Sequence, residues 1–182
     1  MNWSIRLAVQ ADLEALARIE LDASATLAAA LGEADGDTVI TSPQLLTDAI
    51  ASRLVFIATN ENENPVGFVA CAELDGLLYI GEIDVMRAFQ RQGLGRHMLE
   101  HALAEGRKRN FMGAMLTTDR HVPFNAPFYR TVGFVEIPEP DMPPSLAKVI
   151  AAERLREIGP SRRVGMIHLF AAGKLEPAER PA

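Results

Sequence analysis

Two glycines that follow an apolar strand and open a helix constrain this sequence more than any other feature. Residues 82–99 read EIDVMRAFQRQGLGRHML, and the apolar alternation ends near Met86. After a polar stretch, Gly93 and Gly95 begin a segment with helical spacing of apolar residues. Glycine lets a ligand approach the backbone, and the first N–H groups of a helix have no intrahelical acceptors. With the positive end of the helix dipole, this pattern indicates an anion site whose spacing suits a pyrophosphate.

Three kinds of phosphate-binding loop have comparable glycine patterns. A dinucleotide loop needs a third glycine, but Met98 stands there. A P-loop needs Gly-Lys-Ser/Thr, which this segment lacks. In the coenzyme A loop of acetyltransferases, Gln or Arg is followed three and five residues later by glycines, as are Gln90, Gly93 and Gly95 here. A tight strand-to-helix turn without a ligand is the remaining alternative.

A second segment points to the same class of protein. Residues 121–137, HVPFNAPFYRTVGFVEI, contain Asn125, then Phe-Tyr ending at Tyr129, then Gly-Phe. With the glycine loop before it, the chain resembles the GNAT superfamily of acyl-CoA N-acyltransferases, and bacterial members in particular. The resemblance covers nearly the whole chain, up to the closing segment RVGMIHLF at 163–170. It implies a mixed α/β fold with a central, mostly antiparallel sheet flanked by helices. Its fourth and fifth strands would splay apart to admit acyl-CoA.

The hydrophobic pattern predicts one mixed α/β domain around a sheet. Strands are expected at 5–9, 53–59, 66–74, 77–86, 112–118, 134–137 and 163–170. Helices are expected at 13–31, 43–50, 93–110, 125–132 and 145–157. Asp12 is a predicted helix N-cap, and 32–38 is turn-rich. No repeat or long linker divides the chain, so a single N-acetyltransferase domain is expected over 1–173, with a flexible tail over 174–182.

Composition excludes several classes of protein. The 182 residues are 48% hydrophobic and 23% charged, which argues against a mostly disordered chain. The net charge of −6 argues against a nucleic-acid partner. The single cysteine, Cys71, lies in an apolar run, so a buried residue in a reducing compartment is expected. No apolar run approaches the ~18 residues of a membrane span, and signal-peptide features are missing, so a cytoplasmic protein without a membrane partner is expected.

The family resemblance assigns candidate chemistry to the strand before the glycine loop. Glu82 is the candidate general base, because the family often places a catalytic glutamate in that strand, acting directly or through water. Alternation puts Glu82 and Asp84 on one face and Ile83 and Val85 on the other. Asp84 as base and deprotonation of the substrate through water remain alternatives. So does a structural pairing of one carboxylate with a nearby arginine such as Arg87.

The resemblance also implies an acid and a set of cofactor-binding residues. Tyr129 matches the tyrosine that protonates the departing coenzyme A sulfur, since a phenol of pKa ~10 keeps its proton at neutral pH. A core aromatic residue is the alternative. Asn125 resembles the residue that hydrogen-bonds the pantetheine arm or the diphosphate, or it is a helix N-cap. Val85 matches the position whose main chain pairs with pantetheine. The residues expected to bind acetyl-CoA are Ile83, Asp84, Val85, Gln90, Arg91, Gln92, Gly93, Leu94, Gly95, Arg96, Asn125 and Phe128.

One competing motif indicates a metal. Residues 97–101, HMLEH, fit the inverted zinc-protease pattern H-x-x-E-H, whose histidines would share a metal. The glycine loop runs directly into this helix, and Glu153 or Glu157 would have to serve as the third ligand. We therefore expect no metal site and solvated helix-face histidines. His121 and His168 are expected to be structural or on the substrate side.

The expected function is transfer of an acetyl group from acetyl-CoA to a primary amine of a small molecule or peptide, by direct attack. A non-catalytic acyl-CoA-binding or interaction module of the same fold is the alternative, and it would not need Glu82 and Tyr129. An acetyltransferase acting on charged tRNA is disfavoured by the net charge. Acidic residues on the expected acceptor side would suit a cationic amine, or they are ordinary solvated acids: Glu20, Asp22, Glu33, Asp35, Asp37, Glu136, Glu139 and Asp141. Homodimers are common in the family, and the sequence leaves the acceptor and the acyl length open.

Overall fold

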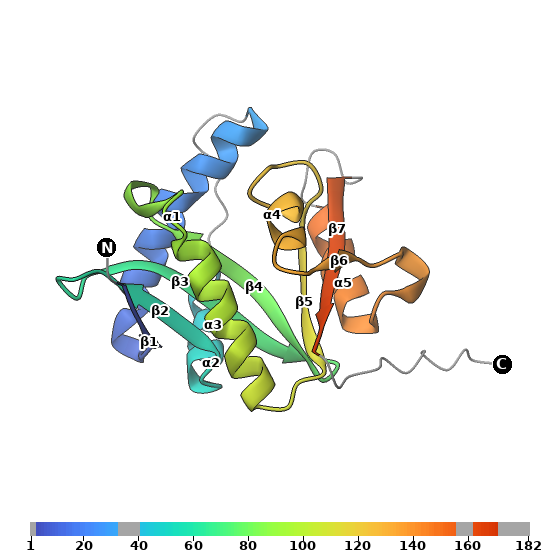
Figure 1. Cartoon of the computed structure of the whole chain (residues 1–182), viewed down its shortest axis with the longest axis horizontal. Coiled ribbons are helices and arrows are strands. Elements are labelled where there is room, and N and C mark those ends of the chain that lie inside the picture. Colours follow the sequence, from blue (N-terminus) through green and yellow to red (C-terminus); the bar gives the residue numbers. More distant parts are fainter. Residues whose placement is uncertain (1–2, 33–40, 156–161, 171–182) are drawn as a thin grey trace. The chain divides into compact units, whose positions relative to one another are not determined.

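The structure, a computed structural model, describes residues 3–32, 41–155 and 162–170. Its strands are β1 (Ser4–Leu7), β2 (Val55–Thr59), β3 (Pro65–Leu74), β4 (Leu77–Val85), β5 (Gly113–Asp119), β6 (Val135–Glu136) and β7 (Arg163–Leu169) (Figure 1). Its α helices are α1 (Leu13–Leu31), α2 (Pro43–Ala51), α3 (Leu94–Lys108), α4 (Ala126–Arg130) and α5 (Pro144–Arg154). Short 3-10 helices are η1 (Gln10–Asp12), η2 (Arg87–Phe89) and η3 (Glu139–Asp141). Each predicted strand and helix is present with similar ends, whereas the 3-10 helices were not predicted.

Hydrogen bonds order the strands β1-β2-β3-β4-β5-β7-β6. The β1–β2, β2–β3, β5–β7 and β6–β7 pairs are antiparallel, and β4–β5 is parallel. The β4–β5 register joins Leu78 to Ala114 and Tyr79 to Met115, near the start of both strands. This short parallel pairing fits strands that splay. The predicted mixed, mostly antiparallel sheet is therefore confirmed.

The chain divides into two compact units, which are described separately. The first comprises Met1–Ala72 and Ile80–Ala104, and the second comprises Glu73–Tyr79 and Glu105–Ala182. The segment 33–38 of the expected turn and the expected tail at 174–182 lie outside the described residues.

The first unit is built around β1, β2, α1 and α2, with parts of β3, β4 and α3. Its core cluster consists of Ala8, Leu16, Ile19, Leu46, Val55, Ile57, Phe68 and Ala70. Helix α3 buries the apolar residues that helical spacing predicts, namely Leu94, Met98, Leu99, Ala102 and Leu103. Gly67 of β3 gives this helix room, because a Cβ there would lie 3.0 Å from Met98 Cε. The start of α3, which carries the glycine loop, is thus held against the sheet by its own apolar face.

The second unit is built around β5, β6 and β7 with α4 and α5. Its core cluster joins the start of β4 to β5, α5 and β7 through Leu77, Met115, Leu146 and Ile167. Gly113 is required for the close approach of β5 and β7, since a Cβ there would lie 2.6 Å from the backbone oxygen of His168. The pairing of β5 with β7 therefore fixes the strand that leads to the Asn125–Tyr129 segment.

Asp12 stands where the sequence predicts a helix N-cap, but its side chain pairs with Arg6. It stands at the N-cap position of α1, but its side chain makes no capping hydrogen bond. Its two carboxylate oxygens instead accept hydrogen bonds from the Arg6 guanidinium at 2.7 and 2.9 Å, and one also accepts from the Val9 backbone N–H at 2.8 Å. The residue thus ties β1 to the start of α1.

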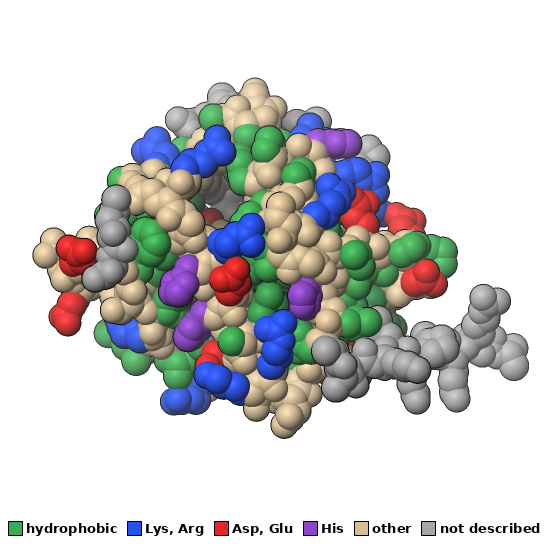
Figure 2. Space-filling model, in the orientation of Figure 1, with side chains coloured by type: hydrophobic (Ala, Val, Ile, Leu, Met, Phe, Trp, Pro, Cys, Tyr) green, Lys and Arg blue, Asp and Glu red, His purple; other side chains and the backbone are tan. Residues whose placement is uncertain are grey.

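Charged side chains of both signs share the surface. On the face drawn in Figure 2, Lys and Arg side chains are interspersed with Asp and Glu side chains rather than gathered in one basic patch. Cys71 is a buried free cysteine, as predicted. Of the helices in the described ranges, none combines the length and the apolar character that crossing a bilayer requires.

Candidate active site

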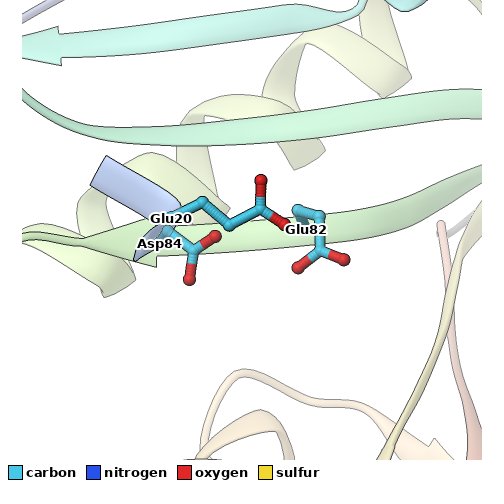
Figure 3. A group of neighbouring side chains, drawn as sticks. All are labelled: Glu20, Glu82 and Asp84. Carbon is cyan, nitrogen blue, oxygen red and sulfur yellow. The ribbon is translucent and has the colours of Figure 1, made fainter. Parts of the chain in front are cut away.

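The two carboxylates that alternation places on one face of β4 lie together, and a third joins them. Glu82 and Asp84 come from β4, and Glu20 extends to them from α1 (Figure 3). One oxygen of each carboxylate lies within 4.8 Å of the others. Sequence reasoning named Glu20 among the acidic residues on the acceptor side and did not place it with the β4 carboxylates. The missed signal is its position four residues after the buried Leu16, on the apolar stripe of α1.

Glu20 is a buried carboxylate with one satisfied oxygen. Only 6% of the residue is exposed. Its Oε1 accepts hydrogen bonds from the Thr41 backbone N–H at 2.6 Å and from the Thr41 hydroxyl at 2.8 Å. Its Oε2, like Oδ2 of Asp84, is shielded from solvent and has no hydrogen-bond partner among the described residues. Buried acceptors of this kind destabilise a fold unless a proton or a cation compensates them.

Asp84 responds to this environment by holding a proton. Burial raises the pKa of Asp84 to about 7, and the negative charge of Glu20 contributes to the rise. Like charges that share a site favour protonation of one of them. A carboxyl group that titrates near neutral pH both accepts and releases a proton under working conditions, which is what general acid–base chemistry requires.

Arg87 pairs with an acid other than the β4 carboxylates. Its Nε lies 3.1 Å from Asp22 Oδ1, and its backbone N–H donates to Asp22 Oδ2 at 2.6 Å. Asp22 lies on α1, close in sequence to Glu20. The guanidinium is thus taken up by a different acid.

Helix α1 also holds the glycine loop. Besides the Asp22–Arg87 pair, the Thr26 hydroxyl donates to Gln90 Oε1 at 3.1 Å. Gln90 in turn donates from Nε2 to the backbone oxygen of Val85 at 2.9 Å. Asp22 and Thr26 are one helical turn apart, so a single face of α1 positions both ends of the segment from 85 to 90. Sequence reasoning assigned Gln90 to the cofactor but did not predict these contacts.

The two glycines of the loop serve different purposes. Gly93 has φ +90° and Arg91 has φ +61°, so the loop turns through left-handed backbone that suits glycine. Gly95 lies inside α3, and a Cβ there would meet only Val85 Cγ2, at an ordinary 3.8 Å. The fold therefore does not require glycine at 95. Close approach of a ligand to the helix N-terminus is the physical reason that remains.

The other predicted cofactor residues around the loop have mixed surroundings. Arg91 and Gln92 are exposed, and Leu94 is a core residue with 1% exposure. Arg96 lies 3.7 Å from Glu100 one turn later. Ile83 and Val85 are partly buried. Because the Leu94 side chain is buried, Leu94 can take part in anion binding only through its backbone.

In the second unit, Tyr129 is packed by aromatic neighbours. The residue lies in α4 and is 7% exposed. Its ring centroid is 5.2 Å from that of Phe128 and 5.7 Å from that of Phe134. Asn125 stands at the N-cap of α4, but its side chain makes no capping hydrogen bond. The N-cap alternative for Asn125 thus holds for its position and not for its amide.

The H-x-x-E-H pattern is not assembled into a ligand set. His101 packs edge-on against Phe56, with centroids 5.0 Å apart, and Glu100 lies beside Arg96. His97 is exposed. His101 therefore differs from the solvated histidine expected there. Glu153 pairs with Arg163 at 3.2 Å, and Glu157 lies outside the described residues.

His121 and His168 have different surroundings within the second unit. His121 is exposed, whereas the His168 ring lies between Phe134 and Phe170, with its Nε2 at 3.3 Å from the Arg107 guanidinium. The contacts of His168 are those of a structural residue.

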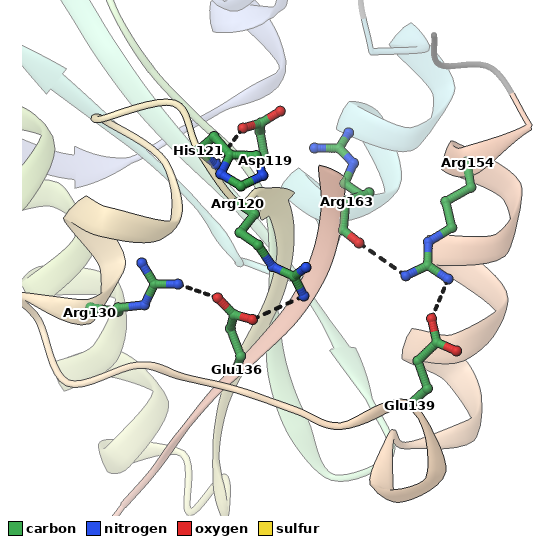
Figure 4. A network of polar contacts seen from close by, with 8 residues as sticks. All are labelled: Asp119, Arg120, His121, Arg130, Glu136, Glu139, Arg154 and Arg163. Carbon is green, nitrogen blue, oxygen red and sulfur yellow. Dashed lines mark hydrogen bonds and ion pairs between the residues drawn. The ribbon is translucent and has the colours of Figure 1, made fainter. Parts of the chain in front are cut away.

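Acidic residues of the second unit are neutralised by arginines. Glu136 pairs with both Arg120 and Arg130, and Arg154 pairs with Glu139 at 2.6 Å (Figure 4). Arg120, Glu136, Glu139 and Arg154 line a cavity of about 210 Å³. Glu136 and Glu139 are therefore paired with arginines, and their charges are not left unpaired for a cationic substrate. They are also not simply solvated acids. Glu33, Asp35 and Asp37 lie outside the described residues.

Comparison with known proteins identifies the family. The Acetyltransferase (GNAT) family matches residues 21–134, which is more than half of the chain, and the chain belongs to this family. Among solved structures, it resembles ribosomal-protein-S18-alanine N-acetyltransferase from Escherichia coli at 22% identity and a TM-score of 0.65, covering 96% of this chain and 99% of that one. It also resembles PaiA N-acetyltransferase from Thermoplasma acidophilum, solved with coenzyme A, at 15% identity and a TM-score of 0.69, covering 93% and 100%.

A third similar structure is Arabidopsis thaliana Naa50 in complex with a bisubstrate analogue. The identity is 19%, the TM-score is 0.63, and the match covers 93% of this chain and 100% of that one. At such identities these likenesses establish the fold, and the family match establishes membership.

Proposed function

We propose that this chain transfers an acetyl group from acetyl-CoA to a primary amine of a small molecule or peptide, by direct attack of the amine on the thioester. The observation that carries the proposal lies within the first unit. Strand β4 bears two carboxylates of the three-carboxylate cluster and leads directly into the glycine loop. Packing does not explain the glycine at position 95 of this loop. An anion site and a proton acceptor on one short segment match the two requirements of acyl transfer from coenzyme A to an amine.

The proton acceptor is proposed to be a β4 carboxylate. An alkylammonium of pKa ~10.4 must lose a proton before its nitrogen attacks. Glu82 is the candidate that the family resemblance suggests. Asp84 has a pKa of about 7, which is closer to the pKa of the ammonium than that of an ordinary carboxylate. A water between the amine and either group is compatible with both roles.

Tyr129 is proposed to donate the proton that the leaving sulfur takes. As the nitrogen–carbon bond forms and the carbon–sulfur bond breaks, the thiolate accepts this proton and leaves as the thiol. A phenol suits the task because it remains protonated at neutral pH. Asn125 and Phe128, beside Tyr129 on the same short segment, are proposed to contact the cofactor. The coenzyme A in the PaiA structure supports acetyl-CoA as the co-substrate.

A non-catalytic module on the same fold is the second candidate. Such a module would need the loop from Gln90 to Arg96 but not the carboxylates. The shielded, unpartnered oxygens of Glu20 and Asp84 destabilise the protein without helping an anion to bind, which favours the enzyme. We further propose that the two units together form the single domain expected over 1–173, and that it works in the cytoplasm.

Cofactor binding tests the proposal through Gly95. Acetyl-CoA at 100 times its Kd should stabilise the parent protein by ~2.7 kcal/mol in a thermal-shift assay, and NADH should not. Gly95→Val should abolish this response while the unliganded protein still melts cooperatively, because the first added carbon meets only Val85 at 3.8 Å. His97→Val, on the exposed face of the same helix, is the matched control and should respond like the parent.

Two results would contradict this scheme. Absence of a shift with millimolar coenzyme A would remove the cofactor assignment. An unchanged affinity in Gly95→Val would remove the anion site. Thiol release from acetyl-CoA across a panel of amines would then separate the enzyme from the non-catalytic module.

A further inference from the structure

Glu20 carries a charge that its structural contacts do not require. Its Oε1 accepts both hydrogen bonds from Thr41, and a glutamine oxygen would accept them equally. Its Oε2 is buried and has no partner among the described residues, and the Glu20 carboxylate lies beside the two β4 carboxylates (Figure 3). A buried, half-satisfied carboxylate directed at two others therefore points to a ligand that supplies positive charge.

Within the part that the structure describes, the protein supplies no such charge to Glu20 or Asp84. No ion pair there joins Glu20 or Asp84 to Lys or Arg. The nearby Arg87 is held by Asp22. Proton uptake by Asp84 compensates the unliganded site in part. A cation from outside would supply the positive charge that this site lacks.

The spacing of the oxygens accommodates an ammonium. Because one oxygen of each carboxylate lies within 4.8 Å of the others, a point exists that is at most ~2.8 Å from each, and an N–H···O hydrogen bond spans that distance. A primary ammonium presents three N–H donors. Ca²⁺, which takes only oxygen ligands, is the alternative occupant.

We propose that Glu20, Glu82 and Asp84 form an ammonium-binding subsite, with Glu20 as its specificity-determining residue. The acceptor is then an alkylammonium compound, such as an aliphatic amine, a diamine or a lysine side chain. An α-amino acid would bring its own carboxylate against three others and be rejected. This inference rests on the proposed function, because it treats the bound cation as the acceptor. Asp84 supports it, since a bound cation favours the ionised form of that carboxyl group.

Binding of matched probes tests the proposal on the full chain saturated with coenzyme A. Pentylamine, norleucine and pentan-1-ol share an alkyl chain, and norleucine is pentylamine with a carboxylate on the amine-bearing carbon. By calorimetry at pH 7, pentylamine should bind at least ten times more tightly than either of the others. Calcium chloride alone is the metal probe, and it should not compete with pentylamine.

Glu20→Gln is the decisive variant, because it keeps the acceptor for Thr41 and removes the charge. It should weaken pentylamine binding at least tenfold and leave the Kd of coenzyme A within twofold of the parent. Glu14→Gln removes an exposed charge from the same helix and should change neither.

Each other outcome overturns a stated part. Equal binding of pentylamine and norleucine to the parent, an unchanged pentylamine Kd in Glu20→Gln, or displacement by Ca²⁺ would overturn the ammonium subsite while coenzyme A binding and acetyl transfer stand. Failure of the parent to bind coenzyme A would overturn the proposed function instead. Because the comparison of probes uses the parent protein, the subsite is tested even where a variant fails to fold.

Discussion

Two aspartates, Asp119 in the second unit and Asp84 in the first, have pKa values shifted in opposite directions. In the second unit, Asp119 accepts hydrogen bonds from Arg162 at 2.7 Å and from the backbone N–H groups of His121 and Val122. Desolvation alone would raise the pKa of Asp119, but these hydrogen bonds outweigh it and hold the pKa below its ordinary value. In the first unit, burial and the charge of Glu20 raise the pKa of Asp84 to about 7.

This contrast separates carboxylates that stabilise structure from those that are available for chemistry. Where arginines surround an acid, as around Glu136, its charge is used to join neighbouring segments (Figure 4). Where a buried acid has no countercharge, the fold loses stability and keeps a group that titrates at working pH. Perturbed groups of the second kind concentrate at functional sites.

Removal of the base is the largest effect we expect. Glu82→Gln or Asp84→Asn, whichever removes the base, should lower kcat/KM for an identified amine by ~10²-fold or more, with partial recovery as the pH is raised. If ionised Asp84 is the base, kcat/KM of the parent falls as the pH drops below about 7. Asp84→Asn should remove this fall from the pH–rate profile. A pH–rate profile of both variants measures this. Parent-like turnover in both would leave positioning alone as the source of catalysis.

An uncharged group in the second unit provides the next test. Tyr129→Phe retains the packing against Phe128 and Phe134 and removes only the hydroxyl. We expect kcat to fall by about 10²-fold, near the lower end for general acid catalysis, with acetyl-CoA affinity unchanged. Steady-state kinetics with a binding titration checks this. Unlike loss of the base, this loss should not recover at higher pH.

Stability should change in opposite directions for the two aspartates. The pKa of Asp84 is higher in the folded than in the unfolded state, so the stability from its protonation is complete below pH ~4 and is lost as the pH rises through about 7. Asp84→Asn should therefore raise the free energy of unfolding at pH 8, by on the order of 2–4 kcal/mol. Urea unfolding from pH 5 to 8 measures this, and a stability gain that does not grow with pH would contradict it.

Asp119→Asn is the matched variant in the second unit. Because the pKa of Asp119 is lowered on folding, its contribution is present above pH ~4 and is lost as the pH falls through the folded value. The substitution should lower the free energy of unfolding at pH 7 by ~1–3 kcal/mol, since charged hydrogen bonds are lost. Urea unfolding of this variant beside Asp84→Asn shows whether the two signs differ. Equal signs would end the distinction between the two aspartates.

The smallest effect is expected at the exposed arginine pairs. The side chains of Arg120 and Arg130 are 45% and 46% exposed, so water replaces Glu136 when it is removed. Glu136→Gln should lower the free energy of unfolding by less than ~1 kcal/mol at moderate salt. Thermal melts at low and high salt check this. A loss above that size would show that the network of Figure 4 is part of the core.

Local sequence patterns predicted most of the strands and helices and part of the candidate site. Alternation along β4 placed Glu82 and Asp84 on one face, and the glycine spacing located the start of α3. These features repeat over two to five residues, within the range over which backbone geometry determines neighbours. The family followed from the order of two such segments.

Only the tertiary structure brought Glu20 to the β4 carboxylates, paired Arg87 with Asp22 and joined Thr26 to Gln90. The last two contacts span 65 and 64 residues, so no local periodicity encodes them. The tertiary structure also distinguishes the two glycines of the loop. Backbone conformation explains Gly93 but does not explain Gly95. The physical reason is that burial and countercharge depend on which elements pack together, and a carboxylate's pKa depends on both.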